Sequence, residues 1–128
     1  MPAQRRIADA IAAALLAMAT NATALDLPAT SAREIDALLA KLGDSGCRFQ
    51  RNGSWHAAAE ARGHVERKYR YLLDRRQVGS AEDFITLAAS KSSISGESYR
   101  VRCGDAPPVP SAEWLGTELV RLRAGARP

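Results

Sequence analysis

The sequence predicts a mostly helical α+β domain in which helices cover a small two-stranded sheet. Three observations favour this class. Four segments repeat apolar residues at helical spacing, two short segments alternate apolar and polar residues, and Gly, Pro and Ser clusters separate them. The expected order is α-β-α-α-β-α, since two strands this short bury a core only when helices cover them.

The first helix is expected to begin at Ser31. Ser31 can cap the helix, and Glu34 stands three residues later, which is the spacing of a capping box. Gly43 is typical of the position just after a helix. The apolar residues between them form one stripe: Ile35, Leu38, Leu39 and Leu42.

A short strand follows, in which Cys47 and Phe49 alternate with polar residues. Asn52-Gly53 signals the turn that ends it, because Gly permits a positive φ. We expect this turn to lead into a second helix that Ser54 caps and that runs to about residue 74. Its buried face is expected at Ala58, Ala61, Val65, Tyr69 and Leu72.

The third helix is expected to begin at Ser80, with Asp83 completing its cap. Its inward face comprises Phe84, Leu87 and Ala88. A serine-rich loop then leads to the second strand, in which three alternate residues share one side: Tyr99, Val101 and Cys103.

The last helix is expected after a connection stiffened by prolines, residues 104–110. Ser111 can cap this helix. Its apolar positions are Trp114, Leu115, Leu119 and Leu122.

Residues 1–24 have the features of a signal peptide. Arg5 and Arg6 precede an apolar run over 7–19, and Ala22-Thr23-Ala24 supplies a cleavage site. The run is shorter than the ~20 residues of a membrane-spanning helix, and no later segment could span a membrane. We therefore expect a single periplasmic domain over residues 25–128. The alternative is an amphipathic N-terminal helix of a cytosolic protein.

Cys47 and Cys103 are the two cysteines of the chain. In an oxidising compartment one pair is best explained by a disulfide, which would make the two predicted strands neighbours. Two free buried thiols are the alternative. A zinc site that combines the cysteines with the two histidines does not fit the spacings of structural zinc sites.

His56, Glu60 and His64 follow one another at four-residue intervals on the expected second helix. Over eight helical residues the two rings would point ~80° apart and lie ~12 Å apart along the axis, which argues against a shared metal ion. We expect His56 on the solvated side, and His64 with Lys68 at the border of the buried face. These residues form either a merely solvated face or a binding surface.

An enzymatic alternative rests on the Ser90–Ser95 loop around Lys91, or on His64. A serine nucleophile needs a base within hydrogen-bond reach. Ser-x-x-Lys spacing is absent because residue 88 is Ala, so we assign no catalytic residue and no cofactor. The alternative function is a small envelope hydrolase.

Basic residues concentrate between Arg62 and Arg76, with Tyr69 and Tyr71 among them. In the cytosol such a segment would suggest nucleic acid. Export leaves the anionic groups of the cell envelope as counterparts, so we expect no nucleic-acid partner.

The chain also resembles a known family. The motif Arg51-Asn52-Gly53, followed by His56, His64 and Lys68, and the segments SAEDFI, ASKSSISG and PVPSAEWL resemble the YfeK-like family of small exported bacterial proteins. The resemblance spans about residues 31–122. That family has no known function, so the resemblance implies an exported single domain but neither an activity nor site residues. The cysteine pair is outside its pattern.

The motif nevertheless has a physical interpretation. The positive end of the helix after the turn, beside Arg51, would attract an anion. His64 and Lys68 lie too far along the axis to share one small ligand with that end, which favours an extended partner. The sequence thus predicts a monomeric, non-enzymatic periplasmic binding or accessory protein for an unknown, anionic envelope component. The candidate binding residues are Arg51, Asn52, Gly53, His56, His64 and Lys68.

Overall fold

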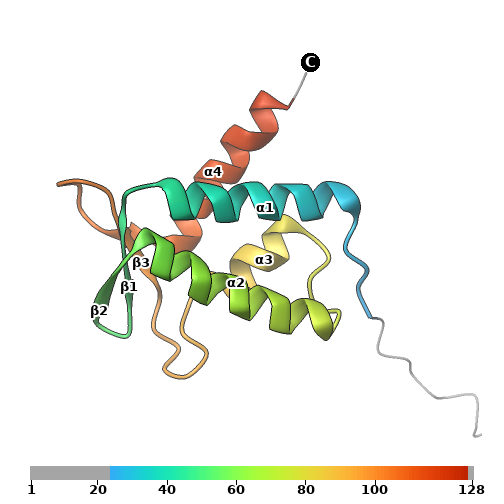
Figure 1. The fold of residues 1–128 in the computed structure, drawn as a ribbon, viewed down its shortest axis with the longest axis horizontal. Helices are drawn as coiled ribbons and strands as arrows, with labels where there is room; N and C mark the ends of the chain where they lie inside the picture. The colour runs from blue at the N-terminus through green and yellow to red at the C-terminus, as the bar shows by residue number, and fades with distance from the viewer. Residues whose placement is uncertain (1–23, 127–128) are drawn as a thin grey trace, which may run out of the picture.

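The computed structural model describes residues 24–126, so the predicted signal peptide lies outside the described residues except for Ala24. The described part is an α+β domain in which four helices accompany a small antiparallel sheet, as Figure 1 shows. The predicted class is therefore confirmed. No helix within residues 24–126 is both long enough and apolar enough to cross a bilayer.

Eight elements follow one another within residues 24–126. They are α1 (Ala29–Asp44), β1 (Arg48–Arg51), β2 (Ser54–Ala57), α2 (Ala58–Asp74), α3 (Ala81–Ala88), β3 (Arg100–Arg102), β4 (Val109–Pro110) and α4 (Ser111–Gly125). The expected order lacks β2 and β4, so it was wrong at these two strands.

The sheet has four strands in the order β2-β1-β3-β4, all antiparallel. The two predicted strands, β1 and β3, are its central neighbours, which confirms their pairing. The prediction of a two-stranded sheet was wrong. β2 runs directly into the alanine-rich start of α2, and β4 has two residues, of which one is proline. Strands this short show no clear alternation in the sequence.

The turn after β1 forms a β-hairpin. Asn52 and Gly53 have φ values of 50° and 81°, as the two central residues of a type I′ turn require, and Arg51 pairs with Ser54 across it. The expectation that this turn leads directly into a helix capped by Ser54 was wrong. His56 consequently lies on a strand and not in the first turn of α2.

Two other predicted helix starts were also wrong. Proline, not serine, occupies the N-cap position of α1 and of α4, at Pro28 and Pro110, so Ser31 lies inside α1 and Ser111 is the first residue of α4. α1 also continues through the glycine at position 43. The Ser80 cap is confirmed, because its hydroxyl accepts the backbone N–H of Asp83 at 3.0 Å.

The core lies where α1 packs against the other three helices and where the inner face of the sheet meets them (Figure 1). Phe49 and Val101 carry the sheet's side of this core. The predicted apolar faces are confirmed with one exception: Leu87 of α3 is exposed, and Ile85 is buried instead. Tyr69 of α2 contacts Phe84 of α3 edge to face.

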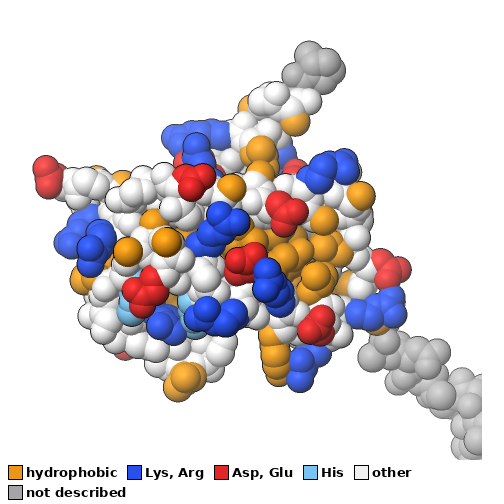
Figure 2. All heavy atoms as spheres, viewed as in Figure 1, with side chains coloured by type: hydrophobic (Ala, Val, Ile, Leu, Met, Phe, Trp, Pro, Cys, Tyr) orange, Lys and Arg blue, Asp and Glu red, His pale blue; other side chains and the backbone are white. Residues whose placement is uncertain are grey.

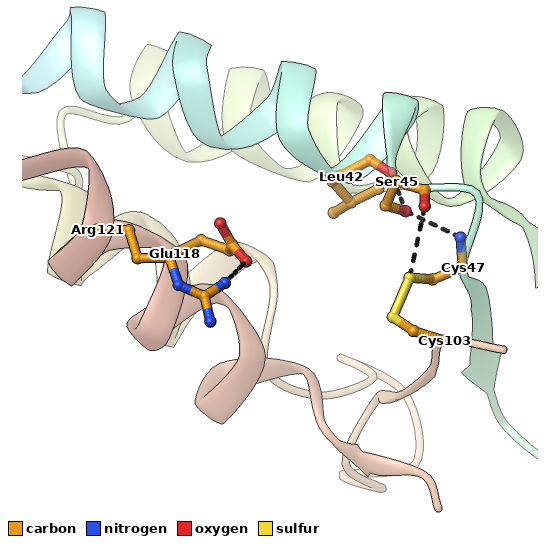
Figure 3. The surroundings of a disulfide bond; sticks show 6 residues. All are labelled: Leu42, Ser45, Cys47, Cys103, Glu118 and Arg121. Carbon is orange, nitrogen blue, oxygen red and sulfur yellow. Dashed lines mark hydrogen bonds and ion pairs between the residues drawn. A yellow bond between two sulfur atoms is a disulfide. The ribbon is translucent and has the colours of Figure 1, made fainter. Parts of the chain in front are cut away.

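A disulfide joins Cys47 to Cys103, which confirms the predicted bond (Figure 3). Their Cα atoms are 4.3 Å apart, just before β1 and just after β3. Ser45 fixes the chain between α1 and the bond, since its hydroxyl donates to the carbonyl of Leu42 and accepts the N–H of Cys47 (Figure 3).

Candidate functional site

Four polar side chains meet on the inner side of the sheet, beside the core. We call them the His64 cluster: Arg51, His64, Lys68 and Tyr99. Arg51 shares a face with Phe49, two residues earlier on β1, and Tyr99 shares a face with Val101 at β3. α2 packs near these strands and contributes the other two, which are four residues apart on one side of the helix.

The cluster is joined by hydrogen bonds. Arg51 Nη1 lies 3.0 Å from His64 Nδ1, and His64 Nε2 lies 3.0 Å from the Tyr99 hydroxyl oxygen. Lys68 Nζ donates to the same oxygen at 3.1 Å and to the backbone carbonyl of Lys91 at 2.8 Å. The predicted position of His64 and Lys68 at the border of the buried face is confirmed, and these hydrogen bonds hold both side chains there.

These contacts determine where the protons lie. A guanidinium group can only donate, so Nδ1 of His64 accepts and the proton of the neutral ring is on Nε2. His64 therefore donates to Tyr99, as Lys68 does. Because the Tyr99 oxygen accepts both hydrogen bonds, its own proton remains free to donate to a further acceptor.

Burial controls the ionisation of the cluster. Burial, and to a smaller extent the positive charges of Arg51 and Lys68, lower the pKa of His64 to about 4. Burial also lowers the pKa of Lys68, with a smaller contribution from Arg51. Burial raises the pKa of Tyr99. At neutral pH the cluster thus contains a neutral imidazole and a neutral phenol.

The surroundings of the cluster are positively charged. Arg51, Arg67 and Lys68 surround His64 and contribute to its low pKa, and none of them belongs to the seven ion pairs of residues 24–126. Figure 2 shows the two histidine side chains on one face, next to Lys and Arg side chains. The carboxylate of Glu60, four residues before His64 on α2, contacts His56. The arrangement suits a negatively charged group.

Two hollows border the cluster. A pocket of ≈ 60 Å³ lies on the Arg51 side, and its polar lining includes both histidines, Glu60, Arg67 and Tyr99. A groove of ≈ 330 Å³ lies on the Lys68 side, lined by His64, Arg67, Lys68, Tyr71, Leu72, Leu87 and Ser93. A ligand on the cluster could extend into both.

His56 is placed differently from the prediction. It lies opposite Phe49 on the inner side of the sheet, its side chain is only 20 % exposed, and Nδ1 contacts Glu60 Oε2 at 2.9 Å. His56 shares a pocket with His64. The expectation of an anion site at a helix start beside Arg51, apart from His64 and Lys68, is wrong, because Arg51 precedes a strand and contacts His64.

The remaining motif residues, Asn52 and Gly53, lie at the hairpin turn and not in the cluster. The Ser95 hydroxyl donates to the Asn52 side-chain carbonyl and ties the serine-rich loop to this turn. Two members of the site were missed from the sequence, Tyr99 and Arg67. The sequence predicts Tyr99 on the buried side of a strand. A buried tyrosine hydroxyl needs a hydrogen-bond partner, and this need could have indicated that Tyr99 belongs to a polar site.

The serine-rich loop lies beside α2, but its hydroxyl groups bind elsewhere. Ser90 donates to the Ile85 carbonyl, and the Ser92 oxygen accepts two backbone N–H groups of its own loop. Among the hydrogen bonds of the described residues, none joins a serine of this loop to Lys91, His64 or Lys68. The hydrogen bonds of the described residues therefore do not support the enzymatic alternative. Residues 24–126 also contain no group of three or more His, Cys, Asp or Glu side chains that could hold a metal ion.

Together, the fold and site define a small α+β domain with a basic, hydrogen-bonded site beside its sheet. The chain belongs to the DUF5329 family, a family of unknown function, whose model matches residues 29–123. This match confirms the expected membership of a family of unknown function; the finer relation to YfeK-like proteins stays a prediction. Searches of curated proteins and of solved structures found no match.

Proposed function

We propose that the protein is a non-enzymatic binding or accessory module that holds an anionic group of an envelope component at the His64 cluster. One observation carries the proposal: three positive side chains surround a neutral histidine and a tyrosine hydroxyl that still has a proton to donate. Nothing in this arrangement requires a reaction, because every group in it can act by donating hydrogen bonds.

The donors of the cluster favour an oxyanion. Lys68 has a third N–H beyond the two already used, Arg51 has further N–H groups, and Tyr99 has its hydroxyl proton. Hydrogen bonds from charged donors to a carboxylate or phosphate are about twice as strong as neutral ones. Partial burial strengthens them further, because water screens them less.

Binding of inorganic phosphate and of acetate, measured by calorimetry at low salt, tests the proposal. We expect Tyr99→Phe to weaken binding about ten-fold through the loss of one hydrogen bond, and Lys68→Met to weaken it more. Lys91→Met, which removes an exposed lysine side chain outside the cluster, is the matched control and should bind as the wild type does. Equal affinities of Lys68→Met and Lys91→Met would contradict the proposal.

The periplasmic location is part of the same proposal. It is supported by the N-terminal sequence and by the disulfide, which persists in oxidising compartments. Intact-mass measurement of the envelope fraction should give a chain that begins near Leu25. A full-length product in the cytosol would contradict export, and it would leave the anion-binding measurement unaffected.

A further inference from the structure

A second basic surface lies on the side of the sheet opposite to the His64 cluster. Successive strand residues point to opposite faces, so Arg48, Arg100 and Arg102 point away from the core that contains Phe49 and Val101. All three arginines are exposed. We call this surface the arginine face; it also includes Trp55 of β2.

The arginine face works against the stability of the fold. Arg48 lies directly opposite Arg102 in the register of β1 and β3, and like charges in opposed positions destabilise a sheet. Arg100 is on the same face, two residues from Arg102. None of these three arginines belongs to the seven ion pairs of residues 24–126, so no ion pair among these residues offsets the repulsion.

Trp55 orders one of these charges. The guanidinium carbon of Arg102 lies 4.5 Å from the centre of the Trp55 ring, so Arg102 reaches across β1 and is held over the indole. The ring thereby restricts the side chain before any ligand arrives. An ordered arginine loses less entropy when it binds, which favours recognition of anions.

We propose that the arginine face binds the surface of a membrane that contains anionic phospholipids. The positive charge of the arginines complements the negative charge of the phospholipids. One guanidinium group can also donate two hydrogen bonds to two oxygens of the same phosphate. The three arginines stand side by side on the outer surface of two neighbouring strands, β1 and β3. A plane of phosphates can contact all three of these exposed side chains at once. The inference is independent of the function proposed for the His64 cluster.

Co-sedimentation of the purified protein with vesicles tests the inference. We expect binding to vesicles of phosphatidylcholine with 30 % phosphatidylglycerol, weaker binding as salt increases, and none to phosphatidylcholine alone. The triple variant Arg48→Gln, Arg100→Gln, Arg102→Gln should lose roughly 100-fold in affinity, at about five-fold for each arginine. The matched control, Arg33→Gln, Arg70→Gln, Arg75→Gln, has the same net charge as the arginine-face variant. It changes exposed residues of α1, of α2 and just after α2, and it should bind as the wild type does.

A second variant separates binding from folding. Arg48→Glu would place a carboxylate opposite Arg102, so it should raise the melting temperature and lower vesicle binding together. Equal loss of binding in the arginine-face and control variants would overturn the inference. So would tighter binding, at equal phosphate concentration, to single-stranded DNA or to polyphosphate than to the vesicles.

Discussion

Arg51 Nη1 donates a hydrogen bond to Nδ1 of His64 across 3.0 Å, so a positive charge faces the nitrogen that protonation of the ring would use. Protonation of His64 in the folded protein would break this hydrogen bond and place two positive groups in contact. The low pKa of His64, about 4, follows first from its burial and then from Arg51.

The stability of the protein should therefore decrease in mild acid. As the pH falls from 6.5, the ordinary pKa of histidine, towards 4, His64 gains a proton in the unfolded chain but not in the folded one. Uptake of protons by the unfolded chain lowers the free energy of unfolding. His64→Gln, whose amide can accept from Arg51 and donate to Tyr99, should show a shallower decrease between pH 7 and pH 5. Urea unfolding at both pH values measures it, and identical slopes would contradict the assignment.

The two histidines should contribute differently to stability at pH 7. His64→Ala removes two hydrogen bonds from partly buried partners and should cost on the order of 1 kcal/mol. His56→Ala removes a contact with the exposed Glu60, which should cost about 0.5 kcal/mol. Chemical denaturation of both variants gives the comparison. Equal losses of unfolding free energy in the two variants would contradict a larger contribution of His64 to stability.

The disulfide should make a large contribution to stability. It connects residues 56 positions apart, and on the chain-entropy model closing such a loop stabilises by about 4 kcal/mol. Replacing both cysteines by Ser should lower the melting temperature by more than 10 °C for a domain of this size. Thiol titration of the native protein should detect no free thiol in residues 24–126. Two reactive thiols in the folded protein would contradict the bond.

A side chain at the second central residue of the hairpin turn, Gly53, should lower the stability of the protein. Gly53 has φ +81°, so Gly53→Ala should destabilise by roughly 1 kcal/mol through backbone strain. Gly116 lies inside α4 with open space around it, so Gly116→Ala should stabilise by about 0.5–1 kcal/mol. Melting curves of the two variants should shift in opposite directions, and a stabilising Gly53→Ala would refute the turn assignment.

The sequence predicted those features that depend on local periodicity. Three- and four-residue spacing identified the buried faces of the helices, and alternation identified β1 and β3. The disulfide expected between Cys47 and Cys103 then made these two strands neighbours. The failures arose where an element is too short for its period to show. β2 was read as the start of α2 because its residues continue into alanines that favour a helix.

The candidate site was predicted only in part, for a different reason. His64 and Lys68 share one side of a helix, which spacing reveals. Arg51 is 13 residues and Tyr99 is 35 residues away from His64, so their contacts depend on how α2 packs against the sheet. His56 differs from the prediction because it lies on β2, where the angles between helix positions do not apply.

The disulfide has a topological consequence for the site. Arg51, His64, Lys68 and Tyr99 all lie between Cys47 and Cys103, so a single covalent ring contains the whole His64 cluster, whereas α1 and α4 are tails outside it. A single proteolytic cut in the serine-rich loop would leave Tyr99 attached to the α2 fragment through the bond. The same cut in the reduced protein would separate them, so an oxidised chain can be nicked there and keep its site in one piece.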